Sequence, residues 1–155
     1  MTDKCLLIVA HVPSPNTLRL RDALAEAARQ GAAGGVAIRS MSPFEAGPSD
    51  VLAAQAVILA TTENLGYMSG ALKDFFDRIS DPCLEKTQGL PYALVIRAGH
   101  DGTGTRRAVE TIVTGLRWRA VQAPLILRGE FRESFAEQCI DLGMSIAAGL
   151  EAGIF

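Results

Sequence analysis

The sequence has few of the features that mark a metal-binding, nucleic-acid-binding or membrane-spanning protein. Its 155 residues include three cysteines and two histidines, and the cysteines form no CxxC pair or other zinc-binding pattern. The net charge is only −2, so no general attraction to nucleic acid or anionic lipid is expected. No apolar run approaches the ~20 residues that span a bilayer.

The N-terminus lacks the pattern of a secretory signal, because Met-Thr-Asp-Lys leads directly into an apolar run. We therefore expect a cytoplasmic protein with reduced thiols and with no metal, nucleic-acid partner or membrane segment. Cys5 and Cys139 lie in apolar patterns and are expected in the core, whereas Cys83 follows Pro82 in a predicted loop and is expected to be exposed. The length and the 48% hydrophobic content fit one globular domain, residues 1–155.

Five short apolar runs alternate with helical patterns along the chain. The predicted strands are residues 5–10, 35–40, 56–60, 92–97 and 125–128. Between and after them, apolar residues at helical spacing predict helices over about residues 20–28, from 49, and over 72–79, 109–116 and 135–150. Near-continuous apolar strands that alternate with helices are typical of an α/β fold, with a parallel sheet covered on both faces. Five such units fit a doubly wound sheet with strand order 2-1-3-4-5.

Three polar loops would meet at one edge of such a sheet, beyond the carboxyl ends of its first, third and fourth strands. The first loop, residues 11–17, contains Ser14, Asn16 and Thr17 at the start of a helix. Hydroxyl groups and free backbone N–H groups at a helix start can bind an anion. The same side chains are also good helix caps, so the sequence leaves both roles open.

The second and third loops are rich in glycine. Residues 61–70 form a predicted loop with Tyr67 near its centre, and Leu72 and Phe75 then begin the helical pattern. Residues 98–105 contain three glycines, which allow a backbone to pass close to a ligand.

The segment ATTENLGYMSGALKDFFDR, residues 60–78, resembles the flavin-contacting loop of the flavodoxin-like NAD(P)H-dependent FMN reductases and quinone reductases. The resemblance implies a flavodoxin-like three-layer sandwich with FMN as cofactor and NADH or NADPH as electron donor. It implies reduction of a quinone, a flavin or a similar small acceptor. In the family's phosphate loop Ser14, Asn16 and Thr17 match the pattern, while Val12 and Pro15 depart from it. Pro15 also removes a backbone donor.

The resemblance also implies which residues contact FMN. They are Ser14, Asn16, Thr17, Glu63, Asn64, Leu65, Gly66, Tyr67, Met68, Ser69, Gly70, Gly99, His100, Asp101, Gly102 and Gly104. Tyr67 would cover one face of the ring, and backbone N–H groups of residues 98–105 would stabilise negative charge at its pyrimidine edge. Asp101 would oppose that charge, so we expect it to face outward or to cap the helix. No catalytic residue is assigned, although His100 is a candidate for contact with the substrate.

Two other functions fit the same fold. A flavodoxin-type electron carrier would bind the same cofactor, but such carriers tend to place the flavin between two aromatic side chains and to carry a strong acidic surplus. Tyr67 is the only aromatic residue in the second and third loops, and the net charge is small, so the sequence favours a reductase. A non-catalytic binding protein with a degenerate flavin site is the third possibility.

Related reductases often complete their active site at a subunit interface, so a homodimer or homotetramer is expected. Trp118, between Arg117 and Arg119, is either an interface residue or part of the core. Arg106 and Arg107 lie in the first turn of a predicted helix, where the helix dipole disfavours positive charge. They are either solvated or face an anion, such as a phosphate of the nucleotide or a carboxylate of a neighbouring subunit.

Overall fold

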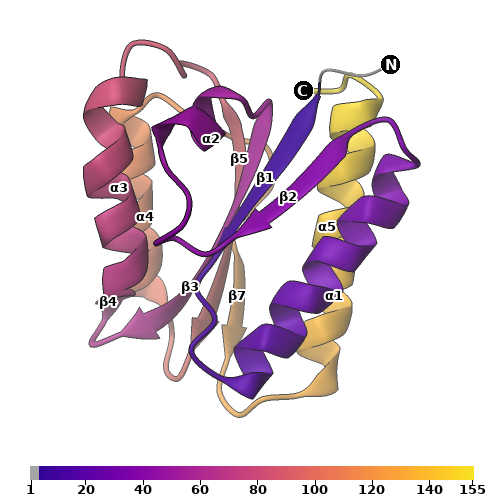
Figure 1. Ribbon diagram of the computed structural model, residues 1–155. Coiled ribbons are helices and arrows are strands. Elements are labelled where there is room, and N and C mark those ends of the chain that lie inside the picture. Colours follow the sequence, from indigo (N-terminus) through magenta and orange to yellow (C-terminus); the bar gives the residue numbers. More distant parts are fainter. Residues whose placement is uncertain (1–3) are drawn as a thin grey trace.

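A computed structural model describes residues 4–155 and shows a parallel sheet with helices on both faces (Figure 1). In chain order the elements are β1 Cys5–Ala10, α1 Pro15–Ala32, β2 Ala37–Met41, α2 Pro48–Leu52, β3 Ala56–Asn64, β4 Tyr67–Met68, α3 Gly70–Cys83, β5 Pro91–Ala98, α4 Thr103–Gly115, β6 Arg119–Ala120, β7 Leu125–Arg128 and α5 Glu133–Glu151. The order across the sheet is β2-β1-β3-β5, with β6 and β7 both pairing with β5. The five longer parallel strands thus follow the predicted order 2-1-3-4-5, and the flavodoxin-like three-layer arrangement is confirmed.

The two faces of the sheet have separate cores. On one face Leu6 and Ile8 of β1 pack with α1 and α5, and on the other Leu7 and Val9 pack with α3 and α4. All four side chains are fully buried because successive residues of a strand point to opposite faces, and both faces are covered (Figure 1). This arrangement explains why the strands are almost entirely apolar.

Helices α1 and α5 approach each other closely enough for backbone to meet backbone. A Cβ atom on Gly31 would lie 2.6 Å from the Met144 carbonyl oxygen, and one on Gly143 would lie 2.4 Å from the Leu24 carbonyl oxygen. Both positions therefore require glycine. Because the helices are in direct contact, their N-termini are held together at the carboxyl edge of the sheet, where Arg19 and Glu133 form an ion pair.

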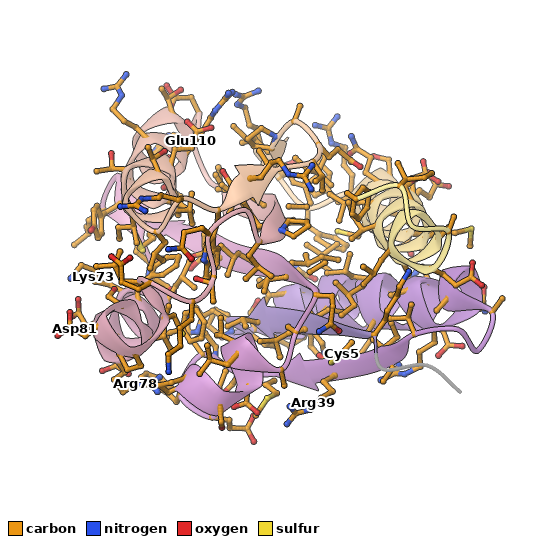
Figure 2. The ribbon with its side chains drawn as sticks, turned by 90° about the horizontal axis from the view of Figure 1, so that it is seen from above. Cys5, Arg39, Lys73, Arg78, Asp81 and Glu110 are labelled. Atoms are coloured by element: carbon orange, nitrogen blue, oxygen red, sulfur yellow. The ribbon has the colours of Figure 1, made fainter. Side chains whose placement is uncertain are left out.

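The outer faces of the helices carry the charged side chains. Lys73 and Asp81 of α3 and Glu110 of α4 project outward from the layers, as Figure 2 shows. Arg78 has a further role, since its guanidinium donates to the carbonyl oxygens of Ala46 and Pro43 as well as pairing with a carboxylate of α3. It thereby fastens α3 to the segment before α2. Within residues 4–155 we find no helix with the length and hydrophobicity of a membrane span.

The predicted loop over residues 61–70 is wrong at residues 61–64, which belong to β3, and at residues 67–68, which form β4. Strand β3 continues to Asn64 and turns into the antiparallel strand β4, with Glu63 opposite Met68 and Asn64 opposite Tyr67. The two turn residues have positive φ angles, +52° at Leu65 and +79° at Gly66, as in a two-residue hairpin of type I′. Glycine adopts this conformation readily but leucine does not, so only Gly66 signalled the turn in the sequence.

The expectation that Cys83 is exposed is wrong, and burial also decides between the two roles left open for Trp118. Cys83 is the last residue of α3 and is fully buried, since the helix continues through Pro82. Burial raises the pKa of its thiol. Trp118 is 6% exposed, and its indole N–H donates to Thr87 Oγ1 at 2.9 Å. The tryptophan is therefore a core residue and not an interface residue.

Candidate functional site

The start of α1 forms one side of the carboxyl edge of the sheet. Ser14 caps the helix, because its Oγ accepts from the N–H of Thr17 while its own N–H donates to Thr17 Oγ1 at 3.0 Å. This capping box confirms the capping role that the sequence allowed. No acidic residue lies in the first turn, so the positive end of the helix dipole is also open to an anion. Asn16 is exposed there, whereas Thr17 is 8% exposed.

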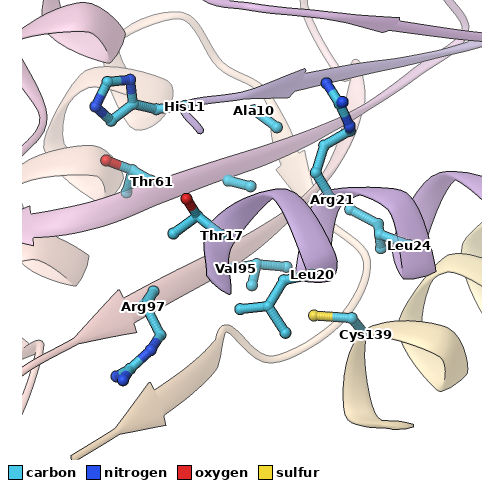
Figure 3. Close-up of a pocket in the computed structure, with 11 residues that line it drawn as sticks. Ala10, His11, Thr17, Leu20, Arg21, Leu24, Thr61, Val95, Arg97 and Cys139 are labelled. Atoms are coloured by element: carbon cyan, nitrogen blue, oxygen red, sulfur yellow. The ribbon is translucent and has the colours of Figure 1, made fainter. Parts of the chain in front are cut away.

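A small cavity lies beneath the first turn of α1 (Figure 3). Its lining includes the polar or charged residues His11, Thr17, Arg21, Thr61 and Arg97, and the rest is apolar. The volume is about 20 Å³, enough for about one water molecule and far below that of a ring-binding pocket. Burial lowers the pKa of His11, which favours the neutral imidazole. A flavin ring would therefore have to lie above this cavity, on the loops.

The β3–β4 hairpin and the glycine-rich loop after β5 are joined by one carboxylate. Glu63 accepts from the backbone N–H of His100 and, with its other oxygen, from that of Gly102, each at 2.9 Å. These are N–H groups that the sequence analysis assigned to the pyrimidine edge of a flavin. In this structure the Glu63 carboxylate accepts hydrogen bonds from both of these groups. Asp101 behaves as expected, because it is exposed and its carboxylate caps α4 by accepting from the N–H of Thr103 at 3.0 Å.

The hairpin also packs directly on the start of α4. The Thr105 hydroxyl donates to the Tyr67 carbonyl oxygen at 2.8 Å. A Cβ atom on Gly104 would lie 2.3 Å from the Gly66 carbonyl oxygen, so glycine at position 104 permits this close approach. The glycine that was predicted to approach a ligand thus approaches the hairpin.

The residues of this segment that were predicted to contact the flavin divide into an exposed group and a buried group. Asn64, Leu65, Gly66 and Tyr67 are exposed, and the side chain of Leu65 at the hairpin tip is fully accessible. Met68 and Ser69 are buried, with 2% and 0% exposure. Ser69 caps α3 by accepting from the N–H of Leu72 at 3.1 Å, so the side chains of these two buried residues do not reach the surface.

The side chains on α3 and α4 next to the hairpin are largely paired. Lys73 and Asp77 form an ion pair at 2.6 Å, and Arg106 pairs with Glu110 one turn further along α4 at 3.2 Å. A carboxylate of its own helix therefore faces Arg106. Arg107 is exposed and forms no ion pair with residues 4–155.

Arg97 is a residue at this edge that the sequence analysis missed. Its Nη1 donates to the carbonyl oxygens of Ala98 and Leu127, at 2.9 and 3.1 Å. In Figure 3 its guanidinium points away from Thr17, toward the end of β7. Its position in an otherwise apolar predicted strand could have identified Arg97 as a candidate site residue from the sequence. No group of three or more histidine, cysteine or acidic side chains within the described residues could hold a metal ion.

Comparison with known proteins finds similarity in structure alone. No protein-family model matches the sequence, and no curated protein matches it. Among solved structures, two-electron reduced Megasphaera elsdenii flavodoxin matches with a TM-score of 0.74 and 16% identity, over 92% of this chain and 98% of that one. A mutant of flavodoxin from Pseudomonas aeruginosa gives 0.74 and 16%, over 97% and 99%.

A larger protein also contains this fold as one part. Rubredoxin oxygen:oxidoreductase from Desulfovibrio gigas matches with a TM-score of 0.75 and 16% identity, over 98% of this chain but 37% of that one. At such identities the likeness concerns the path of the backbone. The chain therefore has the flavodoxin-like fold, over essentially its whole described length.

Proposed function

We propose that the chain is an FMN-binding redox protein with the flavin at the carboxyl edge of the sheet. The observation that carries this proposal is the meeting of the β3–β4 hairpin, the glycine-rich loop and the start of α1 at that edge, where doubly wound folds bind their ligands. Polar turns explain any one of these segments, but they explain poorly why the three loops richest in polar residues and glycine share this edge. FMN would supply the electron-transfer chemistry, and the protein would supply position and electrostatics.

The first turn of α1 would bind the phosphate. Ser14, Asn16 and Thr17 provide hydroxyl and amide groups beside the positive end of the helix dipole. Pro13 and Pro15 carry no N–H, so this loop has fewer backbone donors than a glycine-containing one. The side chains would therefore carry a larger share of the binding, and Thr17 would have to redirect the hydroxyl proton that it donates to the Ser14 carbonyl oxygen at 3.0 Å.

The ring would lie against the exposed part of the hairpin and the glycine-rich loop, with Tyr67 on one side. The flavin ring has fewer free hydrogen-bond donors at this edge than expected, because the N–H groups of His100 and Gly102 already donate to the Glu63 carboxylate. Ring binding there requires Glu63 to give up these hydrogen bonds or the ring to use other backbone groups of the loop.

Within this proposal we favour an NAD(P)H-dependent reductase of a quinone, flavin or similar small acceptor, cytoplasmic and assembled as a homodimer or homotetramer. The support is the single aromatic residue of the site and the net charge of −2, which leave one flavin face free and give little acidic surplus. A flavodoxin-type electron carrier is the second candidate, and the structural likeness to flavodoxins favours it.

Titration of the apoprotein with FMN and riboflavin tests the cofactor and the phosphate site together. FMN should bind more tightly than riboflavin, and Thr17→Ala should reduce that preference by about 0.5–1.5 kcal/mol, the usual contribution of one hydrogen bond. Equal affinity for the two flavins would contradict the phosphate site, and no binding of either would contradict the function.

Addition of NADH or NADPH to the flavin-loaded protein separates the two candidates. Loss of the oxidised flavin spectrum on the time scale of turnover indicates a reductase. An unchanged spectrum, together with reduction by dithionite, indicates a carrier. Light scattering tests the assembly, because a 16.5 kDa particle would contradict it.

A further inference from the structure

Three arginines lie at the carboxyl ends of β5 and β7 and at the start of α5. Arg97 and Arg132 lie on the α5 side of the sheet and Arg128 on the α4 side, because Arg97 pairs with Leu127 and Arg128 with Ala98 in the strand register. This arginine cluster consists of Arg97, Arg128 and Arg132. The Cζ atoms of Arg97 and Arg132 lie 5.0 and 5.2 Å from the centre of the buried Phe135 ring. Arg128 Nε donates to the Asp101 carbonyl oxygen at 2.7 Å, which ties the cluster to the loop.

No carboxylate of residues 4–155 forms an ion pair with any of the three. The acidic side chains nearest along the chain have other positions: Asp101 caps α4, and Glu133 pairs with Arg19. Glu130 is exposed and forms no ion pair within the same range. The chain has 17 acidic residues against 15 basic ones, so a shortage of acids is not the reason. Arg97 and Arg132, which share the Phe135 ring, are like charges without a counter-charge, and this is unfavourable.

Arg97 is held in a way that leaves one edge of its guanidinium available. Nη1 donates to two carbonyl oxygens, and no hydrogen bond to residues 4–155 uses Nε or Nη2. The Nε–Nη2 edge is one that can bind two oxygens of a phosphate at once. Contact with Phe135 and partial burial fix the group before any ligand arrives, and burial lowers its pKa.

We propose that the arginine cluster binds a phosphate group of the nicotinamide nucleotide that donates electrons at this site. Guanidinium groups suit phosphate oxygens, and the hydrogen bond from Arg128 to Asp101 places this arginine at the loop that borders the proposed flavin. The inference rests on the proposed function, and it places the nucleotide phosphate away from Arg106, whose charge Glu110 already offsets. The 2′-phosphate and the pyrophosphate share this chemistry.

The double variant Arg128→Gln/Arg132→Gln tests the proposal. Both side chains are exposed, so the fold should persist, and thermal unfolding checks this. Arg29→Gln is a control for the loss of a single charge, because Arg29 is exposed at the opposite end of α1, where it pairs with Glu26. Binding of 2′,5′-ADP, 5′-AMP and inorganic pyrophosphate to the flavin-free protein is measured by calorimetry. The single variant Arg132→Gln allows comparison with the control at equal charge.

The double variant should weaken binding of 2′,5′-ADP, of pyrophosphate or of both by at least tenfold. Arg132→Gln should weaken it more than threefold and Arg29→Gln less than twofold. A 2′-phosphate site predicts a raised KM for NADPH alone, whereas a pyrophosphate site predicts equal increases for NADPH and NADH. The proposal is overturned if the wild type binds none of the probes, or if the double variant or Arg132→Gln behaves like the control. Because the calorimetry uses flavin-free protein, a failure to bind FMN is a separate result.

Discussion

Replacement of Glu63 by alanine should detach the glycine-rich loop from the β3–β4 hairpin. Both oxygens of this carboxylate accept from the loop, one from the N–H of His100 and one from that of Gly102, each at 2.9 Å. A hydrogen bond to a charged group contributes about 1.5–3 kcal/mol, and the lower end applies here because Glu63 is only half-buried. We therefore expect the free energy of unfolding to fall by about 2–3 kcal/mol.

For a chain of this size 1 kcal/mol corresponds to about 2–4 °C in Tm, so Glu63→Ala should lower Tm by about 4–12 °C. Calorimetry measures this change. Amide hydrogen exchange gives the local readout, because the N–H groups of His100 and Gly102 should exchange faster while those of β1 change only with global stability.

Two variants control for other effects of the substitution. Glu63→Gln retains one acceptor oxygen but turns an NH₂ group toward the second N–H, so it should recover less than half of the lost stability. Glu130→Ala removes an exposed carboxylate that forms no ion pair with residues 4–155, and should leave Tm unchanged. If Glu63→Ala leaves Tm within 1 °C of the wild type and exchange at His100 and Gly102 unaltered, the reasoning is refuted.

Two further predictions concern the core. Gly143→Ala should destabilise the protein in urea unfolding, because its Cβ would lie 2.4 Å from the Leu24 carbonyl oxygen, and overpacking costs about 1–3 kcal/mol against a helix-propensity gain of about 1 kcal/mol. Gly115→Ala, where a Cβ meets nothing within 4 Å, should show no loss; equal effects of the two would contradict the close packing. Burial raises the pKa of Cys139 from 9.0 to about 12, so the unfolded chain loses this proton first as pH rises and stability falls above pH 9. At pH 10 the loss is about 1.4 kcal/mol, and Cys139→Ala should remove that part of the alkaline decline; an identical decline in the two proteins would show that the thiol does not contribute.

Much of the sheet could be predicted from the sequence, because its strands are uninterrupted apolar runs with clear polar ends. Residues 5–10 and 125–128 were predicted with the bounds that the structure shows. The hairpin could not be predicted, since Leu65 adopts positive φ only because strand β4 returns onto β3 there. The burial of Cys83 was missed because Pro82 suggested a loop, whereas α3 continues past it.

For the site, the sequence indicated which loops meet but not what they contact. Alternation of strands and helices brings the carboxyl ends of β1, β3 and β5 to one edge, and this follows from topology. The bonds from Glu63 to His100 and Gly102 depend on side-chain conformation across 37 and 39 positions of the sequence, for which no local pattern exists. The same holds for Arg97 and Arg132 of the arginine cluster, which both lie against the Phe135 ring of α5.

The backbone contact of α1 with α5 has a consequence for how the chain folds during synthesis. The first helix and the last one of the described chain form this contact, so one face of the sheet cannot close until α5 has left the ribosome. Until then Leu6 and Ile8 lack half of their cover, whereas the α3–α4 face can assemble earlier from residues already made. Contacts between distant segments form slowly, and uncovered apolar strands are prone to aggregate. The face covered by α1 and α5 is therefore the last to close during synthesis, and its apolar strands stay partly uncovered until Glu133–Glu151 is available.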